Sequence, residues 1–293
     1  MAKYIGTYAT SGDVQTALDN FELSRPFIAY TTDNENVIYG PMLDKAEVGD
    51  IVVYSVSDDL LHYIKQADYN TTSYPSASYV PVGVVALPQA DDAILGPTGE
   101  ITFMGLNWLD YRYPDTGVKR KNNNVGQVRW GYSNFDIPEL TNYTKSGTAI
   151  TDMNGKANTE TVLQYATAQT NWRTDSAITN TNAEGIYPLF ECAWRYHTSG
   201  TVQGDWYVPA LGQVYFLYNN TTALNQLNSA NTILGVGDYA FTGDTGTNIG
   251  SSNEANDMNA WAWWGKSDFK GTLKYFENDF STRPFCTKLM TRI

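Results

Sequence analysis

The 293-residue sequence is poor in histidine, cysteine and basic residues, and each shortage excludes a class of protein. It has two histidines and two cysteines, too few for a zinc site or a disulfide framework in a chain of this length. Its 19 Lys and Arg stand against 31 Asp and Glu, a net charge of −12, whereas nucleic-acid binding needs a basic surface that neutralises phosphates. We therefore expect no nucleic-acid partner, no metal and no cofactor.

Long apolar runs are also missing. The longest, Tyr79 to Leu87, is interrupted by Pro81 and Gly83 and is far shorter than the roughly 20 apolar residues of a membrane-spanning helix. The first residues show no basic segment followed by an apolar core, so we expect no secretion signal. Synthesis in the cytoplasm would keep both cysteines reduced by default.

Aromatic residues are what the sequence has in abundance. They make up 14% of the chain, with 21 Tyr, 11 Phe and 8 Trp, while charged residues make up only 17%. Disordered chains lack aromatics, so the composition indicates a folded protein. Surfaces rich in Tyr, Trp, Asn, Thr and Gly are typical of recognition proteins and glycan binders, because rigid amphipathic rings supply contact area at low entropic cost.

The first half of the chain is predicted to be rich in β-strands. Short apolar runs separated by polar turns indicate hairpins, and Pro81 places its own strand at a sheet edge or at a strand start. The expected strands are 27–30 paired with 37–39, 49–54 paired with 60–64, and 80–87, with a short helix over 12–23.

The second half shows helix signals. Residues 138–155 are rich in Thr, Asn, Gly and Ser, which is typical of a linker. Helices are predicted over 159–169, 187–196 and 209–218, the last two led by Pro188 and Pro209, a position that helices tolerate. Beyond residue 233 we expect glycine-rich loops and short strands. The fold class is therefore α+β, with a β-rich domain over 1–145 and a second domain over 146–293.

Several short motifs suggest chemistry that their surroundings do not support. Gly235 to Ala240 fits a dinucleotide-binding pattern, but no helix pattern follows it. Asp152 to Gly155 suggests a calcium loop, but the last position of such a loop, which must be an acidic residue, would be Leu163. Cys192 and His197 would lie on different faces of a helix, so they do not form a nucleophile with its base. The basic run 119–121 is interpreted as a solvated loop, or else as a contact with an acidic neighbouring subunit. We expect no catalytic residues.

From residue 154 onward, a series of motifs follows in order. The motifs are Asn154-Gly155-Lys156-Ala157-Asn158-Thr159, the helix bearing Cys192, Gly204-Asp205-Trp206-Tyr207-Val208-Pro209-Ala210-Leu211-Gly212-Gln213, Gly250-Ser251-Ser252-Asn253-Glu254, Ala260-Trp261 and Arg283-Pro284-Phe285. Together they resemble the bacterial and phage domain related to the C-terminal domain of the Legionella collagen-like adhesin, which has a C-type lectin fold. The series spans about 140 residues and lacks the calcium signatures of sugar-binding animal lectins, so the resemblance does not imply calcium-dependent binding.

The resemblance assigns structural roles to several residues. It implies that Cys192 and Cys286 are neighbours, either in a disulfide or as two packed thiols. From the residues themselves, Trp206 can pack over the first turn of the helix that Pro209 begins, as a hydrophobic staple. Trp261 shares one face of a strand with Trp263, while Trp264 lies on the other face.

One face of that strand must be core, and the other is expected to contact a ligand. Loops on a rigid scaffold carry recognition, so the loops over 238–259 are expected to contribute as well. Sugar or peptide would stack on aromatic rings and accept hydrogen bonds from amides and hydroxyls. The ligand-binding candidates are Tyr239, Asn253, Asn256, Asn259, Trp263 and Trp264.

The first half carries a second set of segments, Pro26 to Tyr30, Ala67 to Asn70, Tyr74-Pro75 and Tyr79 to Val85. In these it is similar to proteins of Bacteroides-infecting, crAss-like phages, in which such halves precede lectin-like domains. It implies a structural protein of the virion surface, a head fibre or decoration protein or a tail-associated fibre, made in the host bacterial cytoplasm.

In that setting residues 1–145 anchor the protein and residues 146–293 display a lectin-like surface to host glycans or proteins. Its partners would be other virion proteins and further copies of itself, in a homo-oligomer such as a trimer. Two alternatives stay open: an architectural capsid or tail component without a ligand, and a glycan-degrading enzyme of the virion.

Overall fold

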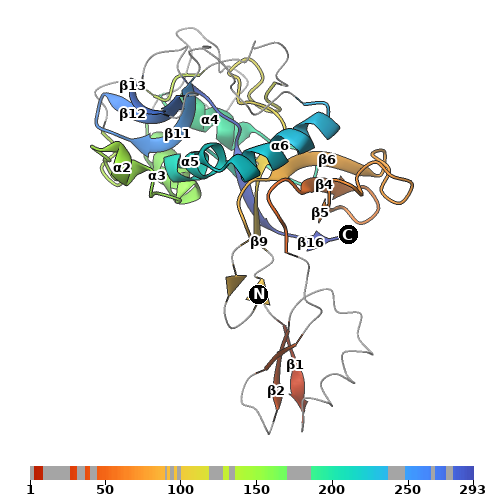
Figure 1. Ribbon diagram of the computed structural model, residues 1–293. Coiled ribbons are helices and arrows are strands. Elements are labelled where there is room, and N and C mark those ends of the chain that lie inside the picture. The colour runs from red at the N-terminus through yellow and green to blue at the C-terminus, as the bar shows by residue number, and fades with distance from the viewer. Residues whose placement is uncertain are drawn as a thin grey trace.

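A computed structural model gives the fold (Figure 1). It describes residues 3–8, 27–31, 37–39, 45–89, 91–92, 96–97, 100–118, 128–131, 136–169, 186–236, 248–264, 268–274 and 280–293. The expected helix over 12–23, the basic run 119–121 and the candidate Tyr239 lie outside these residues.

A seven-stranded sheet organises the described residues. Its neighbouring strands run antiparallel, except that the last strand is parallel to the one beside it. Because the sheet takes strands from both sides of residue 145, it crosses the boundary expected between the two halves. In order, the strands are β10 (Trp206–Tyr207), β15 (Phe285–Leu289), β9 (Glu100–Gly105), β6 (Tyr79–Val85), β4 (Ile51–Ser55), β5 (Leu60–Ile64) and β16 (Thr291–Arg292).

Smaller sheets complete the strand content. A four-stranded sheet in the order β13-β12-β11-β14 lies near the helices, and a three-stranded sheet in the order β1-β2-β3 comes from the start of the chain. The combination of helices and sheets makes the fold α+β. The strands are β1 (Lys3–Tyr8), β2 (Phe27–Thr31), β3 (Val37–Tyr39), the pair β7 (Asp91–Asp92) and β8 (Gly96–Pro97), β11 (Asn248–Glu254), β12 (Asn259–Trp264), β13 (Asp268–Leu273) and β14 (Phe280–Ser281).

The helices of the described residues are short. Helix α4 has Pro188 at its first position, as predicted, and α3 begins four residues before its predicted start. Helix α6 was not predicted, although its buried residues Ala223, Leu227 and Ala230 follow helical spacing. The bounds are α2 (Ser146–Ala149), α3 (Gly155–Thr167), α4 (Pro188–Arg195), α5 (Leu211–Asn219) and α6 (Thr221–Ile233).

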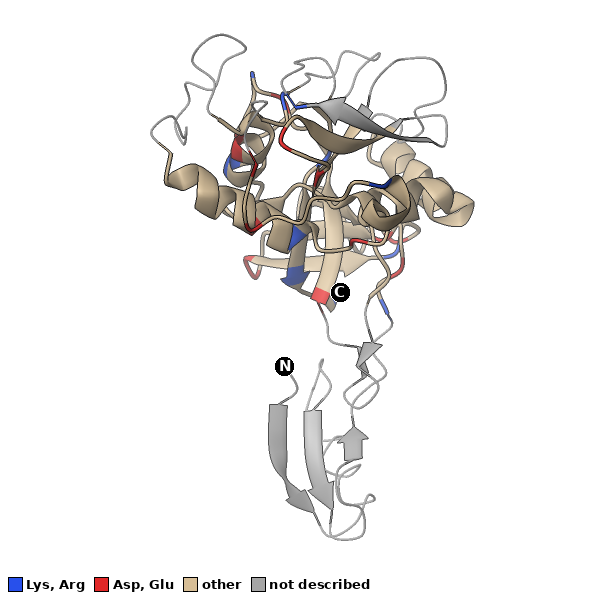
Figure 2. Ribbon diagram, turned by 90° about the vertical axis from the view of Figure 1, so that its left-hand side faces the viewer, with Lys and Arg blue, Asp and Glu red and all other residues tan. Residues whose placement is uncertain are grey.

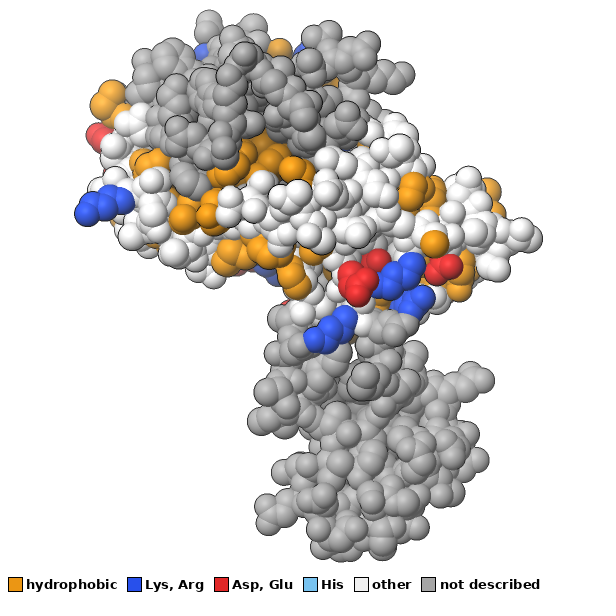
Figure 3. All heavy atoms as spheres, in the orientation of Figure 1, with side chains coloured by type: hydrophobic (Ala, Val, Ile, Leu, Met, Phe, Trp, Pro, Cys, Tyr) orange, Lys and Arg blue, Asp and Glu red, His pale blue; other side chains and the backbone are white. Residues whose placement is uncertain are grey.

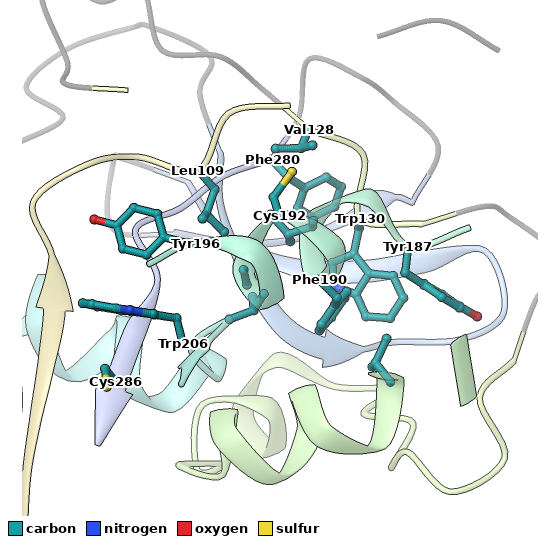
Figure 4. Close-up of a cluster of buried hydrophobic side chains, with 14 of the residues drawn as sticks. Leu109, Val128, Trp130, Tyr187, Phe190, Cys192, Tyr196, Trp206, Phe280 and Cys286 are labelled. Carbon is teal, nitrogen blue, oxygen red and sulfur yellow. The ribbon is translucent and has the colours of Figure 1, made fainter. Parts of the chain in front are cut away.

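The large sheet is covered on both faces. Figure 1 shows α5 and α6 lying across one face, where Leu217 and Leu227 pack with Val53 and Met104. The other face packs against α3, α4 and strands β12 and β14 in the cluster of buried side chains that Figure 4 shows. In it the ring of Trp206 packs edge-on against Phe103 and Tyr196, and Trp130 packs against Tyr187 and Phe190.

The predicted hairpins of the first half are confirmed. Strand β2 pairs with β3, and β4 pairs with β5, both antiparallel. Strand β6, however, lies inside the sheet between β9 and β4 rather than at its edge. Its proline is tolerated because Pro81 lies beside an irregularity in the β4 pairing, and β9 pairs with β6 only from Gly83 onward.

The expected linker over 138–155 is instead packed structure. Leu140 and Ala149 are buried in it, and it contains helix α2. Its many small and polar residues serve turns and hydrogen bonds, for example from the Thr151 hydroxyl to the Thr148 carbonyl at 2.8 Å. Composition alone therefore does not distinguish a linker from a tightly turned segment.

Charged residues are sparse on the described part of the chain, and Figure 2 shows them scattered between uncharged stretches. Within these residues, no helix has both the length and the apolar character that a membrane span requires.

Candidate functional site

Two of the motif segments quoted for the lectin-like resemblance meet at one buried carboxylate. Asp152 is 4% exposed. Its Oδ1 accepts a hydrogen bond from the Asn154 backbone N–H at 2.8 Å, and its Oδ2 accepts from the side-chain amides of Asn158 and Asn253 at 2.7 and 2.6 Å. Three donors from two motif segments, Asn154 and Asn158 from one and Asn253 from the other, therefore hold one negative charge in the interior.

Asn253 continues this network to the start of helix α5. The residue before the helix is Ala210, whose side chain cannot accept a hydrogen bond. Instead, Asn253 Oδ1 accepts from the Leu211 N–H at 2.6 Å, and the Asp152 carbonyl accepts from the Gly212 N–H at 3.0 Å. Residues distant in sequence thus satisfy the free N–H groups of the helix, a function that the capping side chain usually has.

Two glycines allow these segments to approach each other. A Cβ at Gly155 would collide with Gln213 Oε1 and lie 2.6 Å from the Ala210 nitrogen. A Cβ at Gly212 would collide with the Asp152 carbonyl and lie 2.8 Å from that of Ile150. The start of α3 and the start of α5 can therefore touch only because both positions lack a side chain.

A hollow of about 630 Å³ opens beside this contact, and we call it the α3 groove. Its volume falls within the ~300–1,000 Å³ of small-molecule sites. It is formed by the first turn of α3, the start of α5, and one end of strands β9, β10 and β15. Its lining residues are Leu87, Pro88, Glu100, Thr102, Met153, Asn154, Lys156, Ala157, Glu160, Tyr207, Gln213 and Thr287.

Hydroxyl and amide groups line one side of the α3 groove in a continuous chain. The hydroxyls of Thr102 and Thr287 are 2.9 Å apart, and that of Thr287 is 3.2 Å from the Tyr207 hydroxyl. Gln213 Nε2 donates to the same Tyr207 oxygen at 3.5 Å. Burial raises the pKa of Tyr207, so its hydroxyl stays protonated at neutral pH and serves as a hydrogen-bonding group.

The other side of the groove carries exposed side chains. Lys156, Ala157 and Glu160 project from the first turns of α3, and Met153 before it is 45% exposed. Glu100, at the start of β9, is also exposed and lines the groove. The arrangement combines hydroxyls, amides, an aliphatic surface and both signs of charge, which suits reversible binding of a polar organic ligand.

The three asparagine candidates occupy different environments. Asn253 is 1% exposed and is committed to Leu211 and Asp152, so it stabilises the fold and does not face a ligand. Asn256 is exposed in the turn between β11 and β12, where its Oδ1 accepts from the N–H groups of Met258 and Asn259. Asn259 donates its own amide to Asn256 at 3.1 Å. Neither Asn256 nor Asn259 lines the α3 groove.

The described tryptophan side chains of β12 are buried or half-buried. Trp263 is 3% exposed and packs with Trp108, Val214 and Ile249. On the other face Ala260 and Ala262 are fully buried. Trp261 is half-buried and donates its indole N–H to the Tyr143 carbonyl at 2.6 Å. Trp264 pairs through its backbone with Asn248 and Asp268, and its side chain is outside the description.

The two cysteines are fully buried free thiols that do not lie beside each other, so neither the disulfide nor the pair of packed thiols that the resemblance implied is present. Figure 4 shows Cys192 and Cys286 in separate parts of the same cluster, with Cys286 beside Trp206, its partner in strand register. Burial raises the pKa of the Cys286 thiol, which disfavours the reactive thiolate.

Trp206 and Pro209 are structural, but by other means than a staple. Trp206 belongs to strand β10 and donates its indole N–H to the Thr201 hydroxyl at 2.9 Å. Pro209 is buried two residues before the first residue of α5, and its carbonyl accepts from the Ser252 N–H at 2.8 Å.

Sequence reasoning placed the ligand near 238–259 and missed the residues of the α3 groove. Tyr207 and Gln213 belong to the motif segments, but their spacing in the sequence does not show that they meet Thr102 and Thr287. Those two threonines are adjacent only through the pairing of β9 with β15, 185 residues apart in sequence.

A buried ion pair joins the last residue of β11 to the residue after β13, and neither residue lines the groove. Lys274 Nζ contacts Glu254 Oε1, both side chains are fully buried, and the ammonium lies 4.9 Å from the Trp130 ring centre. Burial raises the pKa of Glu254 and lowers that of Lys274. Among the described residues, no group of three or more His, Cys, Asp or Glu could hold a metal ion.

Comparison with known proteins gave no match to a family model, to a curated protein or to a solved structure.

Proposed function

We propose that the protein is a non-catalytic binding protein of a phage virion surface, with a C-type lectin-like arrangement in residues 146–293 and its ligand site in the α3 groove. The observation that carries the proposal is the convergence of the motif segments: Asn154, Lys156, Tyr207 and Gln213 all line this one groove. The virion setting and the homo-oligomer rest on the resemblances in the sequence.

A hydroxyl-rich ligand such as a host glycan matches the lining. The half-buried hydroxyls of Thr102 and Thr287 can each donate or accept, as sugar hydroxyls do, while the buried Tyr207 hydroxyl behind them contacts Thr287. The aliphatic surface of Met153 and Leu87 can cover the apolar face of a sugar ring. The protonated Tyr207 hydroxyl supports binding rather than nucleophilic chemistry.

The test uses the full chain, because the large sheet takes strands from both halves. Binding is screened on an array of host capsule and mucin glycans and measured by calorimetry. Ala157→Trp fills the groove from an exposed helix position, and Gln164→Trp places the same ring two turns along α3, outside the groove. We expect at least a tenfold loss of affinity for the first variant and none for the second.

Other outcomes separate the alternatives. Binding that survives Ala157→Trp would locate the ligand elsewhere, and an empty array would favour an architectural component. Shortening of the polysaccharide, abolished by Glu100→Gln or Glu160→Gln, would establish an enzyme. Absence of the chain from mass spectra of purified particles would refute the virion setting.

A further inference from the structure

A second hollow, of about 440 Å³, lies on the same face of the sheet, and we call it the α6 groove. It is lined by Glu47, Val48, Asp50, Lys65, Gln66, Pro88, Phe216, Asn220, Thr222, Ala223 and Gln226. Pro88 also lines the α3 groove. We propose that the two grooves are successive parts of one site that binds an oligosaccharide chain, neutral or bearing amino groups, rather than a single sugar. This inference rests on the proposed function of the α3 groove.

Helix α5 connects the two hollows. Gln213, in its first turn, lines the α3 groove, and Asn220, just past its end, lines the α6 groove. Seven residues of helix span about 10 Å. A ligand that contacts both ends must therefore be longer than a single sugar, and it would run along α5 and over Pro88.

The α6 groove has the surface that a further sugar unit requires. Phe216 is half-buried and, with Val48 and Pro88, provides an apolar surface on which a ring can stack. The exposed polar side chains of Thr222 and Gln226 stand at its border. An apolar surface with a few polar groups around it is the usual composition of a small-molecule site.

The charges of the two grooves select the type of chain. Each groove has two carboxylates and one lysine, so each lining is acidic by one charge. In the α6 groove, Lys65 already contacts Asp50 at 2.9 Å and Glu47 at 3.1 Å, and Figure 3 shows acidic and basic side chains side by side on this face. A polyanionic chain would be repelled. The groups are Glu100, Glu160 and Lys156 in one groove, and Glu47, Asp50 and Lys65 in the other.

The experiment measures affinity against chain length, on the full chain, with cello-, manno- and chito-oligosaccharides of about two to eight units as probes. For the wild type, we expect affinity to rise about tenfold between two and six sugar units, because a typical contact with an aromatic ring strengthens binding by about that factor. Phe216→Leu keeps apolar volume but removes the aromatic face, and should abolish the rise while leaving two-unit affinity unchanged. Tyr215→Leu is its control, because this neighbour on α5 lines neither groove.

A second variant tests the α6 groove independently, in case Phe216→Leu does not fold. Thr222→Trp fills the α6 groove from an exposed position and should also remove the length dependence, whereas Asn225→Trp, exposed on the same helix but outside the groove, should not. Binding that is lost in Ala157→Trp but independent of length and of both α6-groove variants would overturn this inference alone. A preference for polyanionic chains would also overturn it. Absence of binding by every probe would overturn the proposed function with it.

Discussion

Asn253 offers a direct test of the interpretation that the motif residues form an internal scaffold. It is 1% exposed, accepts from the Leu211 N–H at 2.6 Å and donates to Asp152 at 2.6 Å. Asn253→Ala leaves one buried N–H without an acceptor and one buried carboxylate short of a donor. Since each unsatisfied buried group costs about 1–3 kcal/mol, and a charged one more, the free energy of unfolding should fall by about 3–5 kcal/mol.

The control is the same substitution at an exposed site. Asn256 also accepts backbone hydrogen bonds, from Met258 and Asn259 at 2.9 and 2.8 Å, but in a solvent-exposed turn. Water can replace the lost acceptor, so Asn256→Ala should cost about 1 kcal/mol or less. Equilibrium urea denaturation followed by tryptophan fluorescence measures both. Equal costs for the two variants would refute the scaffold role of Asn253.

A charge swap distinguishes a specific pair from general loss of packing. Asn253→Asp alone places a second carboxylate beside Asp152, and Asp152→Asn alone removes the charge that three donors surround. In the double variant, one amide again faces one carboxylate. We expect it to be at least about 1 kcal/mol more stable than the sum of the single costs predicts. Strict additivity would mean that the two side chains do not act on each other.

Three further predictions concern the interior. Lys274→Met should cost about 3–5 kcal/mol near neutral pH, because it leaves Glu254 buried without its cation. Burial raises the pKa of Glu254 above its value in the unfolded chain, so the native state of this variant binds a proton that the unfolded state does not. Its stability should therefore recover as the pH falls from about 7 to about 5. Urea denaturation midpoints across that range would show the recovery, and a further loss of stability would contradict it. Cys192 and Cys286 should fail to react with a thiol reagent in the native protein and both react in denaturant; no reactive thiol after unfolding would indicate a disulfide between them. Trp263→Ala should cost about 3–5 kcal/mol without changing glycan affinity, whereas a selective loss of affinity would restore its role as a ligand contact.

Local patterns in the sequence were sufficient for elements whose partners are close by. The hairpin of β4 and β5 follows from two apolar runs around a polar turn, and α4 follows from Pro188 and an apolar stretch. Helix α6 was not predicted because its sequence is rich in Thr, Asn and Ser, whose side chains hydrogen-bond nearby backbone groups and so compete with the hydrogen bonds of an isolated helix. Its stability comes from burying Leu227 and Ala230 on the large sheet, a contact that the sequence does not reveal.

The site was less accessible to sequence reasoning, because its groups come from distant segments. A polar residue in a loop-like, Asn-rich region is expected to face solvent, yet Asn253 finds partners 42 and 101 residues away. The same holds for Trp263, which the open-face argument assigned to a ligand and which packs against α5. Tertiary contacts override local expectation at these positions.

The division between scaffold and surface changes what the lectin-like motifs can predict. The motif residues whose side chains are most tightly bonded, Asn253 and Trp206, are buried and hold the start of α5 and strand β10 in place. The groups that a ligand can reach include Lys156, Glu160 and Thr222. The scaffold fixes their positions, but it does not determine which side chains stand there. A chain could therefore keep every motif and bind a different sugar, so ligand identity has to be tested by varying the exposed residues of the two grooves.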